Sequence, residues 1–151
     1  EVFTADRSAT ENSLIAVGDL LVVENNYGYA PPITATSAGN TSVGGLAAID
    51  VDPRSGRCRV KWENDDIVIP SLVSKATTAG DLVLTYTKPS NPWGVDAWYF
   101  TAVQLDTGEI AWTRLAGTGT PFNNHYAAGY LSPSGDFLVG TVNGLVVLRD
   151  R

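Results

Sequence analysis

Short apolar runs alternate with turn-forming residues along the whole chain. Residues 20–23, 82–86 and 145–148 are aliphatic, β-branched or aromatic, and Gly, Asp, Asn or Pro bounds each run. Apolar residues do not recur at helical spacing over three clean turns, and Gly or Pro interrupts almost every long window. The pattern predicts an all-β protein built from short strands.

One sequence unit recurs three times. A Gly-Asp pair, which favours a tight hairpin turn, stands before an apolar strand at residues 18–23, 80–85 and 135–140. A loop and a second apolar strand follow at 45–50, 98–103 and 144–148. In the first two units a further turn leads to a strand that ends in Trp62 or Trp112. The units repeat every 50 to 60 residues, roughly, which is a period typical of propellers and arrays.

Four short antiparallel strands at this period describe a blade of a β-propeller. We therefore expect one partial propeller domain over residues 1–151, with blades at about 13–66, 67–120 and 121–151. The third unit stops before its fourth strand, which leaves about two and a half to three blades and an incomplete ring. Residues 1–12 are a possible closing strand for a neighbouring blade.

Residues 102–112, with the sequence AVQLDTGEIAW, resemble the tryptophan-docking motif of quinoprotein-like (PQQ-repeat) propellers. Gln104 replaces the usual Asp. Residues 48–62 fit the same motif if two residues are added on each side of the turn, which preserves the register of an antiparallel hairpin. The resemblance implies that both indoles pack between blades. A quinone cofactor is not expected, because complete quinoprotein rings are larger and often carry a vicinal cysteine pair. This chain has too few blades, and Cys58 is its only cysteine.

Composition excludes several classes of function. With 151 residues, 44% hydrophobic and 17% charged, the chain has the make-up of one globular domain. The net charge of −6 disfavours nucleic acid, and no apolar run is long enough for membrane insertion. The lone Cys58 cannot form an internal disulfide or a cysteine-rich metal site. The absence of Met, even at position 1, suggests a processed or excised chain, and we expect an extracellular or periplasmic location.

Ligand chemistry is expected on one rim, where the connections between blades and the loops between second and third strands emerge together. Long loops there span residues 24–43, 64–71, 88–96 and 117–125. Aromatic side chains in these loops, Tyr27, Tyr29 and Trp93, could stack on a sugar or peptide, or could simply cover the blades. The candidate ligand-binding residues are Glu11, Asn25, Tyr27, Trp93, Asp96, Asn123, Asn124 and His125.

His125, the only histidine, is the candidate general base or metal ligand, although a single histidine without an identifiable nucleophile is more often a hydrogen-bonded structural residue. Glu11 occupies the analogous place before the first blade. Carboxylate and amide oxygens that converge on an axis would suit calcium, so Glu11 and Asn124 are candidate metal ligands and calcium is a possible cofactor.

An incomplete ring exposes blade faces and a strand edge, which another part of the molecule must cover. The remaining blades, a second chain or a second copy could do so. Two functions stay open: a propeller scaffold or binding module completed in this way, and part of a six-bladed propeller hydrolase or lyase. In the second, Glu11, Asn123, Asn124 and His125 would surround a central metal site.

Overall fold

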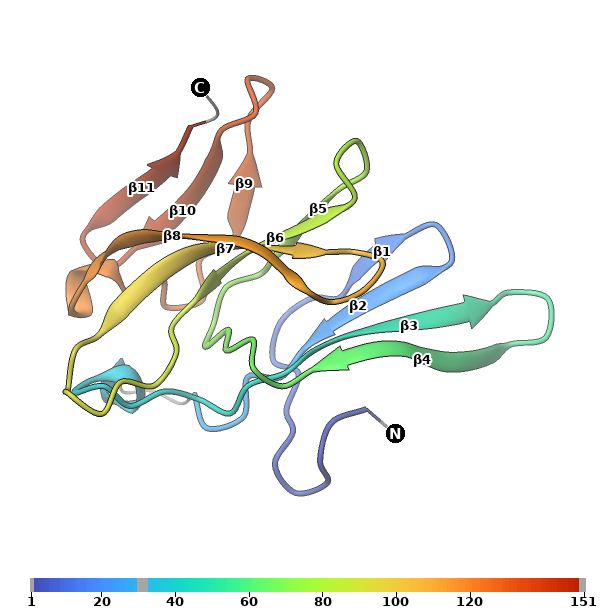
Figure 1. The fold of residues 1–151 in the computed structure, drawn as a ribbon, viewed down its shortest axis with the longest axis horizontal. Helices are drawn as coiled ribbons and strands as arrows, with labels where there is room; N and C mark the ends of the chain where they lie inside the picture. Colours follow the sequence, from blue (N-terminus) through green and yellow to red (C-terminus); the bar gives the residue numbers. More distant parts are fainter. Residues whose placement is uncertain (1, 30–32, 150–151) are drawn as a thin grey trace.

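The structure is a computed structural model that describes residues 2–29 and 33–149. The described chain contains short strands and two single-turn 3-10 helices, η1 and η2 (Figure 1). The elements in order are β1 (Ile15–Val17), β2 (Leu20–Glu24), η1 (Ile33–Thr36), β3 (Leu46–Asp52), β4 (Arg57–Asn64), β5 (Lys75–Thr77), β6 (Leu82–Thr87), β7 (Ala97–Gln104), β8 (Ile110–Thr118), η2 (Thr120–Phe122), β9 (Gly129–Leu131), β10 (Phe137–Thr141) and β11 (Gly144–Leu148).

The strands form three antiparallel sheets in chain order. The first sheet contains β1 to β4, the second contains β5 to β8, and the third contains β9 to β11 (Figure 1). Every strand pairs with its sequence neighbour, so each sheet is a simple meander of the kind that makes a blade. The predicted all-β class and the antiparallel blades are confirmed, and in the described chain the third sheet has three strands.

The repeated Gly-Asp pair makes the same turn contact in the first two sheets. The carbonyl of Asp19 accepts the backbone N–H of Val51 at 2.8 Å, and the carbonyl of Asp81 accepts that of Leu105 at 2.8 Å. In these two sheets the first hairpin turn therefore holds the far end of the third strand.

The two tryptophan strands are also equivalent in register. Trp62 lies opposite Ala48 in the first sheet, and Trp112 lies opposite Ala102 in the second. The pairing of both hairpins is then interrupted by a bulge directly after the alanine. The β3–β4 turn is longer than the β7–β8 turn, yet Trp62 and Trp112 face equivalent alanines. This agrees with placing the extra residues equally on both sides of the first turn.

The seam between the first two sheets is closed by the end of β4. The indole Nε1 of Trp62 donates to the carbonyl of Leu105 at 2.9 Å. The same ring lies flat on Gly108, where an added Cβ would stand 2.5 Å from it. Asn64 donates to the carbonyl of Gly108 at 2.7 Å, and Lys61 pairs with Asp106 at 2.6 Å. Trp62 thus docks on the β7–β8 turn of the next sheet.

The apolar core runs through all three sheets. Tyr86 stacks on Trp98 with ring centroids 5.7 Å apart, and both rings are buried. Phe100 of the second sheet meets Phe137 of the third edge to face at 6.0 Å. Tyr86 is the cross-strand partner of Phe100, and Trp98 is two residues from Phe100, so these rings share one face of the second sheet. That face packs against the third sheet, and the aromatic pairs add to the burial of their area.

Residues 2–12 form no strand in the described structure. Phe3 instead packs against Gly45, and its backbone N–H donates to the Glu63 carboxylate at 3.0 Å. With Val23 and Ala47 it makes a small apolar cluster on the outer face of the first sheet. The closing strand for a blade outside this chain stays a prediction.

The Trp62 seam can be tested by a matched pair of glycine replacements. Gly108 and Gly56 have similar φ values, +74° and +67°, but space around Gly56 is open whereas Gly108 touches the indole. Both G108A and G56A strain the backbone, and G108A adds an overpacking cost of about 1–3 kcal/mol. Urea unfolding should show G108A less stable than G56A by that amount; equal losses would contradict the docking.

Candidate functional site

The loops that carry the candidate residues gather at one end of the sheets, opposite the Gly-Asp hairpins (Figure 1). We call this end the rim and define it by the described residues 24–29, 33–45, 64–74, 88–96 and 119–128. As the sequence predicts, these segments connect second to third strands or one sheet to the next.

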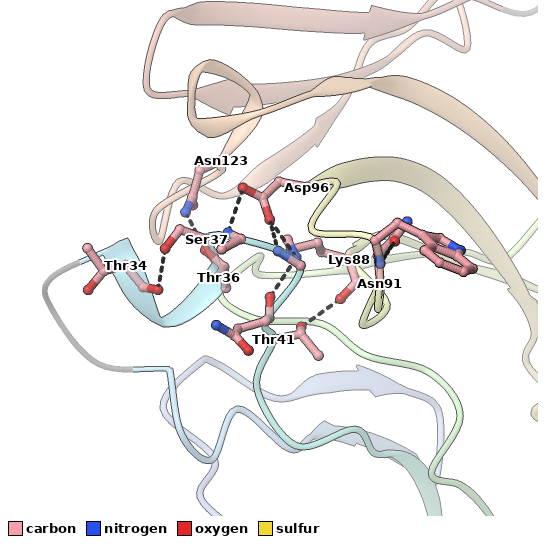
Figure 2. A network of polar contacts seen from close by, with 12 residues as sticks. Thr34, Thr36, Ser37, Thr41, Lys88, Asn91, Asp96 and Asn123 are labelled. Carbon is pink, nitrogen blue, oxygen red and sulfur yellow. Dashed lines mark hydrogen bonds and ion pairs between the residues drawn. The ribbon is translucent and has the colours of Figure 1, made fainter.

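A buried ion pair fixes one side of the rim (Figure 2). Lys88 is fully buried, and its Nζ lies 3.2 Å from Oδ1 of Asp96 and 2.5 Å from the carbonyl of Asn40. Asp96 also accepts the backbone N–H groups of Ala38 at 3.2 Å and Gly39 at 2.8 Å. The β2–β3 loop is thereby held against the β6–β7 loop.

Two predicted ligand residues have structural partners here. Asp96 makes the ion pair above, and Asn25 uses both ends of its amide to join the stretch before β1 to the β2–β3 loop. The Oδ1 of Asn25 accepts from Ala9 and Tyr27, and its Nδ2 donates to Arg7 and Gly44. Their ligand roles stay predictions, but the bonds already made explain why these residue types stand in the loops.

A cluster around Tyr29 fixes the other side of the rim. The phenol oxygen of Tyr29 lies 3.0 Å from Nδ1 of His125 and 3.2 Å from Oδ1 of Asn123. Asn123 in turn donates to Thr36 Oγ1 at 2.9 Å. Burial raises the pKa of Tyr29, so the phenol stays protonated and able to donate. Tyr29 therefore links the β2–β3 loop to the segment that leads into the third sheet.

Glu11 joins the same cluster through Tyr126. The Tyr126 hydroxyl donates to Oε2 of Glu11 at 2.7 Å, and its ring meets that of Tyr29 edge to face at 5.1 Å. Burial, followed by the bond to Glu11, raises the pKa of Tyr126 to about 12. Three segments distant in sequence thus meet at Tyr29: the stretch before β1, the β2–β3 loop and the stretch after η2.

His125 and Tyr126 both adopt left-handed backbone conformations, with φ of 46° and 67°. Such conformations are costly for residues other than glycine, and two in succession persist only where surrounding contacts hold them. Both side chains are nonetheless exposed, Tyr126 to 36%. A strained and exposed pair of this kind is a feature found at functional sites.

The proposed calcium ligands already have hydrogen-bond partners. Glu11 accepts from Tyr126 through Oε2, and Oδ1 of Asn124 accepts weakly from Ser71 at 3.4 Å. The Nδ2 of Asn124 donates to the carbonyls of Ala127 and Gly140 at 2.8 Å each. In residues 2–29 and 33–149 no three His, Cys, Asp or Glu side chains are grouped as metal ligands. The calcium site stays a prediction, and no step below depends on it.

The two remaining candidates are loop aromatics. Trp93 is 87% exposed at the tip of the β6–β7 loop, where its backbone N–H donates to Oδ1 of Asn91 at 2.9 Å. Tyr27 is also exposed. The stacking role of both rings stays a prediction.

Glu24 is a rim residue that sequence reasoning missed. It is almost fully buried at the end of β2, where it accepts the backbone N–H of Ser74 at 3.1 Å and Nδ2 of Asn12 at 3.2 Å. Burial raises its pKa above the ordinary value of 4.5, against the lowering effect of these bonds. The run Glu24-Asn25-Asn26, polar directly after an apolar strand, is the signal that could have identified it.

Comparisons with known proteins support the fold. The chain is similar to the solved structure of the Pseudomonas aeruginosa periplasmic gluconolactonase PpgL, with a TM-score of 0.56 and 19% identity. The likeness covers 97% of this chain and 40% of that one, so the chain spans less than half of its neighbour's length. No family model and no curated protein matches. The three sheets are therefore a propeller-like fragment without a closed ring, and nothing specific to quinoprotein-like repeats was found.

Membrane insertion by a helix finds no support in the structure. Among the described residues, no helix is both long and apolar enough to cross a bilayer.

The ion pair predicts a large effect of neutralising Asp96. D96N leaves the buried Lys88 ammonium without its counter-charge, which should destabilise the fold by about 3–5 kcal/mol. Chemical denaturation measures this loss. The double variant K88M/D96N removes both charges and should recover much of it; a double variant as unstable as D96N would contradict the ion-pair explanation.

The raised pKa of Glu24 predicts the sign of a pH effect on stability. The folded state keeps the Glu24 proton to a higher pH than the unfolded state, so this contribution is complete below about pH 4.5. It is lost as pH rises through the folded pKa. Urea unfolding across this range should show a fall in stability that E24Q lacks, whereas the control E109Q, at an exposed turn, should keep it.

Proposed function

We propose that this chain is a propeller module whose rim binds a neutral, polyhydroxylated small molecule, and whose ring is completed by further blades. The observation that carries the proposal is the Tyr29 cluster. It presents two exposed side chains, His125 and Tyr126, from a backbone that three separate segments hold in a strained conformation.

The chemistry of the cluster favours hydroxyl groups as ligands. Imidazole, phenol and carboxylate offer both donors and acceptors, and the flat rings of Tyr126 and His125 provide apolar faces. The charged side chain in the hydrogen-bonded cluster is Glu11, and among the described residues no Lys or Arg is bonded to it. A phosphate or carboxylate ligand would meet repulsion there, whereas a sugar-like molecule would not.

The completed ring is supported by the exposed surface of the third sheet. Tyr130, Leu138 and Val147 lie side by side across β9, β10 and β11, and Leu145 continues the row along β11. Tyr130, Leu145 and Val147 are exposed, with Leu145 at 59%. Apolar sheet faces of this kind are normally covered, and in a propeller the next blade covers them.

A hydrolase is the second candidate, because the structural neighbour is a gluconolactonase. The Nδ1 of His125 is held by Tyr29, which leaves Nε2 able to take a proton from a water molecule. That water would add to the carbonyl carbon of a cyclic ester, the ring C–O bond would break, and the leaving alkoxide would gain a proton. That neighbour is a periplasmic protein, which supports a location outside the cytoplasm for this chain.

The only histidine makes the binding proposal directly testable. We expect the imidazole NMR signals of His125 to shift in a saturable way on addition of glucose or glucono-δ-lactone, with smaller shifts for gluconate, which carries a charge. Y126F should weaken binding by about 1 kcal/mol or roughly fivefold, because it removes one hydrogen bond.

The control is Y130F, an exposed aromatic on the third sheet, which should bind as the unaltered chain does. Shifts that are absent for all three compounds would overturn the rim proposal. Acid release from the lactone above the spontaneous rate, lost in H125N, would favour the hydrolase over the binding module.

A further inference from the structure

A hollow of about 220 Å³ lies between the stretch before β1 and the rim loops of the first sheet. Phe3, Thr4 and Arg7 line it from the stretch before β1. The remaining lining residues come from the β2–β3 loop and from the segment after β4; they are Asn25, Val43, Gly44 and Asp65. None of these residues belongs to the Tyr29 cluster, so this is a second candidate site.

Backbone contacts fix one wall of the hollow. A Cβ added at Gly44 would collide with the carbonyl oxygen of Asp65, so glycine allows these two segments to lie close together. The neighbouring Gly45 donates its N–H to the carbonyl of Ile67 at 2.9 Å. The buried Asn25 side chain joins the same loop to the stretch before β1. The hollow therefore lies between segments that are held together.

The stretch before β1 contains two strained residues. Phe3 and Asp6 adopt left-handed backbone conformations, with φ of 64° and 65°. A bulky residue such as Phe3 rarely adopts this φ. Arg7 follows directly, and its N–H donates to the carbonyl of Thr4 at 3.2 Å. The strained turn thus carries three of the lining residues, and strain of this kind gathers where ligands are held.

Opposite charges line the hollow without forming an ion pair. Arg7 and Asp65 both line it, yet neither belongs to an ion pair among residues 2–29 and 33–149. Elsewhere in the same sheet Arg59 and Asp50 pair directly at 2.6 Å. A ligand that carries one charge of each sign could pair with Arg7 and Asp65 at the same time.

We propose that this hollow binds a small zwitterion, a free amino acid, through Arg7 and Asp65. The Arg7 guanidinium would hold the carboxylate with two parallel hydrogen bonds, which is the geometry that arginine favours. The Asp65 carboxylate would hold the ammonium group. Phe3 and Val43 supply apolar surface for the carbon atoms between the two charges. A ligand with a single charge would leave one of the two side chains unpaired, so simple acids and simple amines should be rejected.

This inference goes beyond the proposed function and does not depend on it. His125 reports the Tyr29 cluster, whereas the side-chain amide of Asn25 reports the hollow. Sugars should shift the first signal alone and amino acids the second alone, so either proposal can fail without the other.

Glycine, β-alanine and 4-aminobutyrate are the probes, because they place the same two charges at increasing separations. We expect the NMR signals of the Asn25 amide to shift in a saturable way with at least one of them, with a dissociation constant of about 1 mM. Acetate and methylamine each carry one of the two charges, and both should bind at least about tenfold more weakly.

Two variants assign the two charges. R7Q should weaken binding of the best amino acid to about the level of methylamine, and D65N to about the level of acetate. The matched controls are R57Q and D66N, which alter exposed residues outside the hollow and should bind as the unaltered chain does. Urea unfolding shows whether R7Q and D65N remain folded. Should one of them be unstable, the other variant and the acetate and methylamine comparison on the unaltered chain decide.

Three results would overturn the proposal. One is the absence of a saturable shift up to about 10 mM with all three amino acids. Another is binding of acetate or methylamine as tight as that of the best amino acid. The last is a folded R7Q or D65N variant that binds the amino acid as the unaltered chain does.

Discussion

The packing of the Trp62 indole on Gly108 fixes the angle between the first two sheets, and the rim depends on that angle. Trp62 lies on Gly108 and bonds to Leu105, so the first sheet cannot rotate against the second without breaking that contact. The loops at the far end of the same strands are thereby brought within reach of one another. The Lys88 ion pair and the Tyr29 cluster both join loops from different sheets, and both depend on this fixed angle between sheets.

The repeat made most of the fold predictable. The Gly-Asp turns, the apolar strands and the two tryptophans carry local information, because each acts through its own hairpin or through the adjoining sheet. The rim was predictable only as a set of loops. Which side chains meet there depends on how segments separated by about a hundred residues approach, as Tyr29 and His125 do. Nothing in the local sequence marks Lys88 as buried. The polar run after β2 marks Glu24 as a residue of interest, but it does not show that Glu24 contacts Ser74, fifty residues later.

Several features of the rim lower the stability of the folded state. The rim contains a buried ammonium, a buried carboxylate and two consecutive residues in left-handed conformations. A plain turn with glycine would avoid these costs. These features lie together at the end of the sheets where we propose the ligand site.

The tryptophan docking also has a direction. Trp62 is contributed by the last strand of the first sheet and docks on the β7–β8 turn of the sheet that follows it in the chain. A ribosome releases the earlier sheet first, so that sheet displays its indole before the receiving turn exists. The first sheet would therefore be completed only when the second sheet has been synthesised and its β7–β8 turn covers the Trp62 indole.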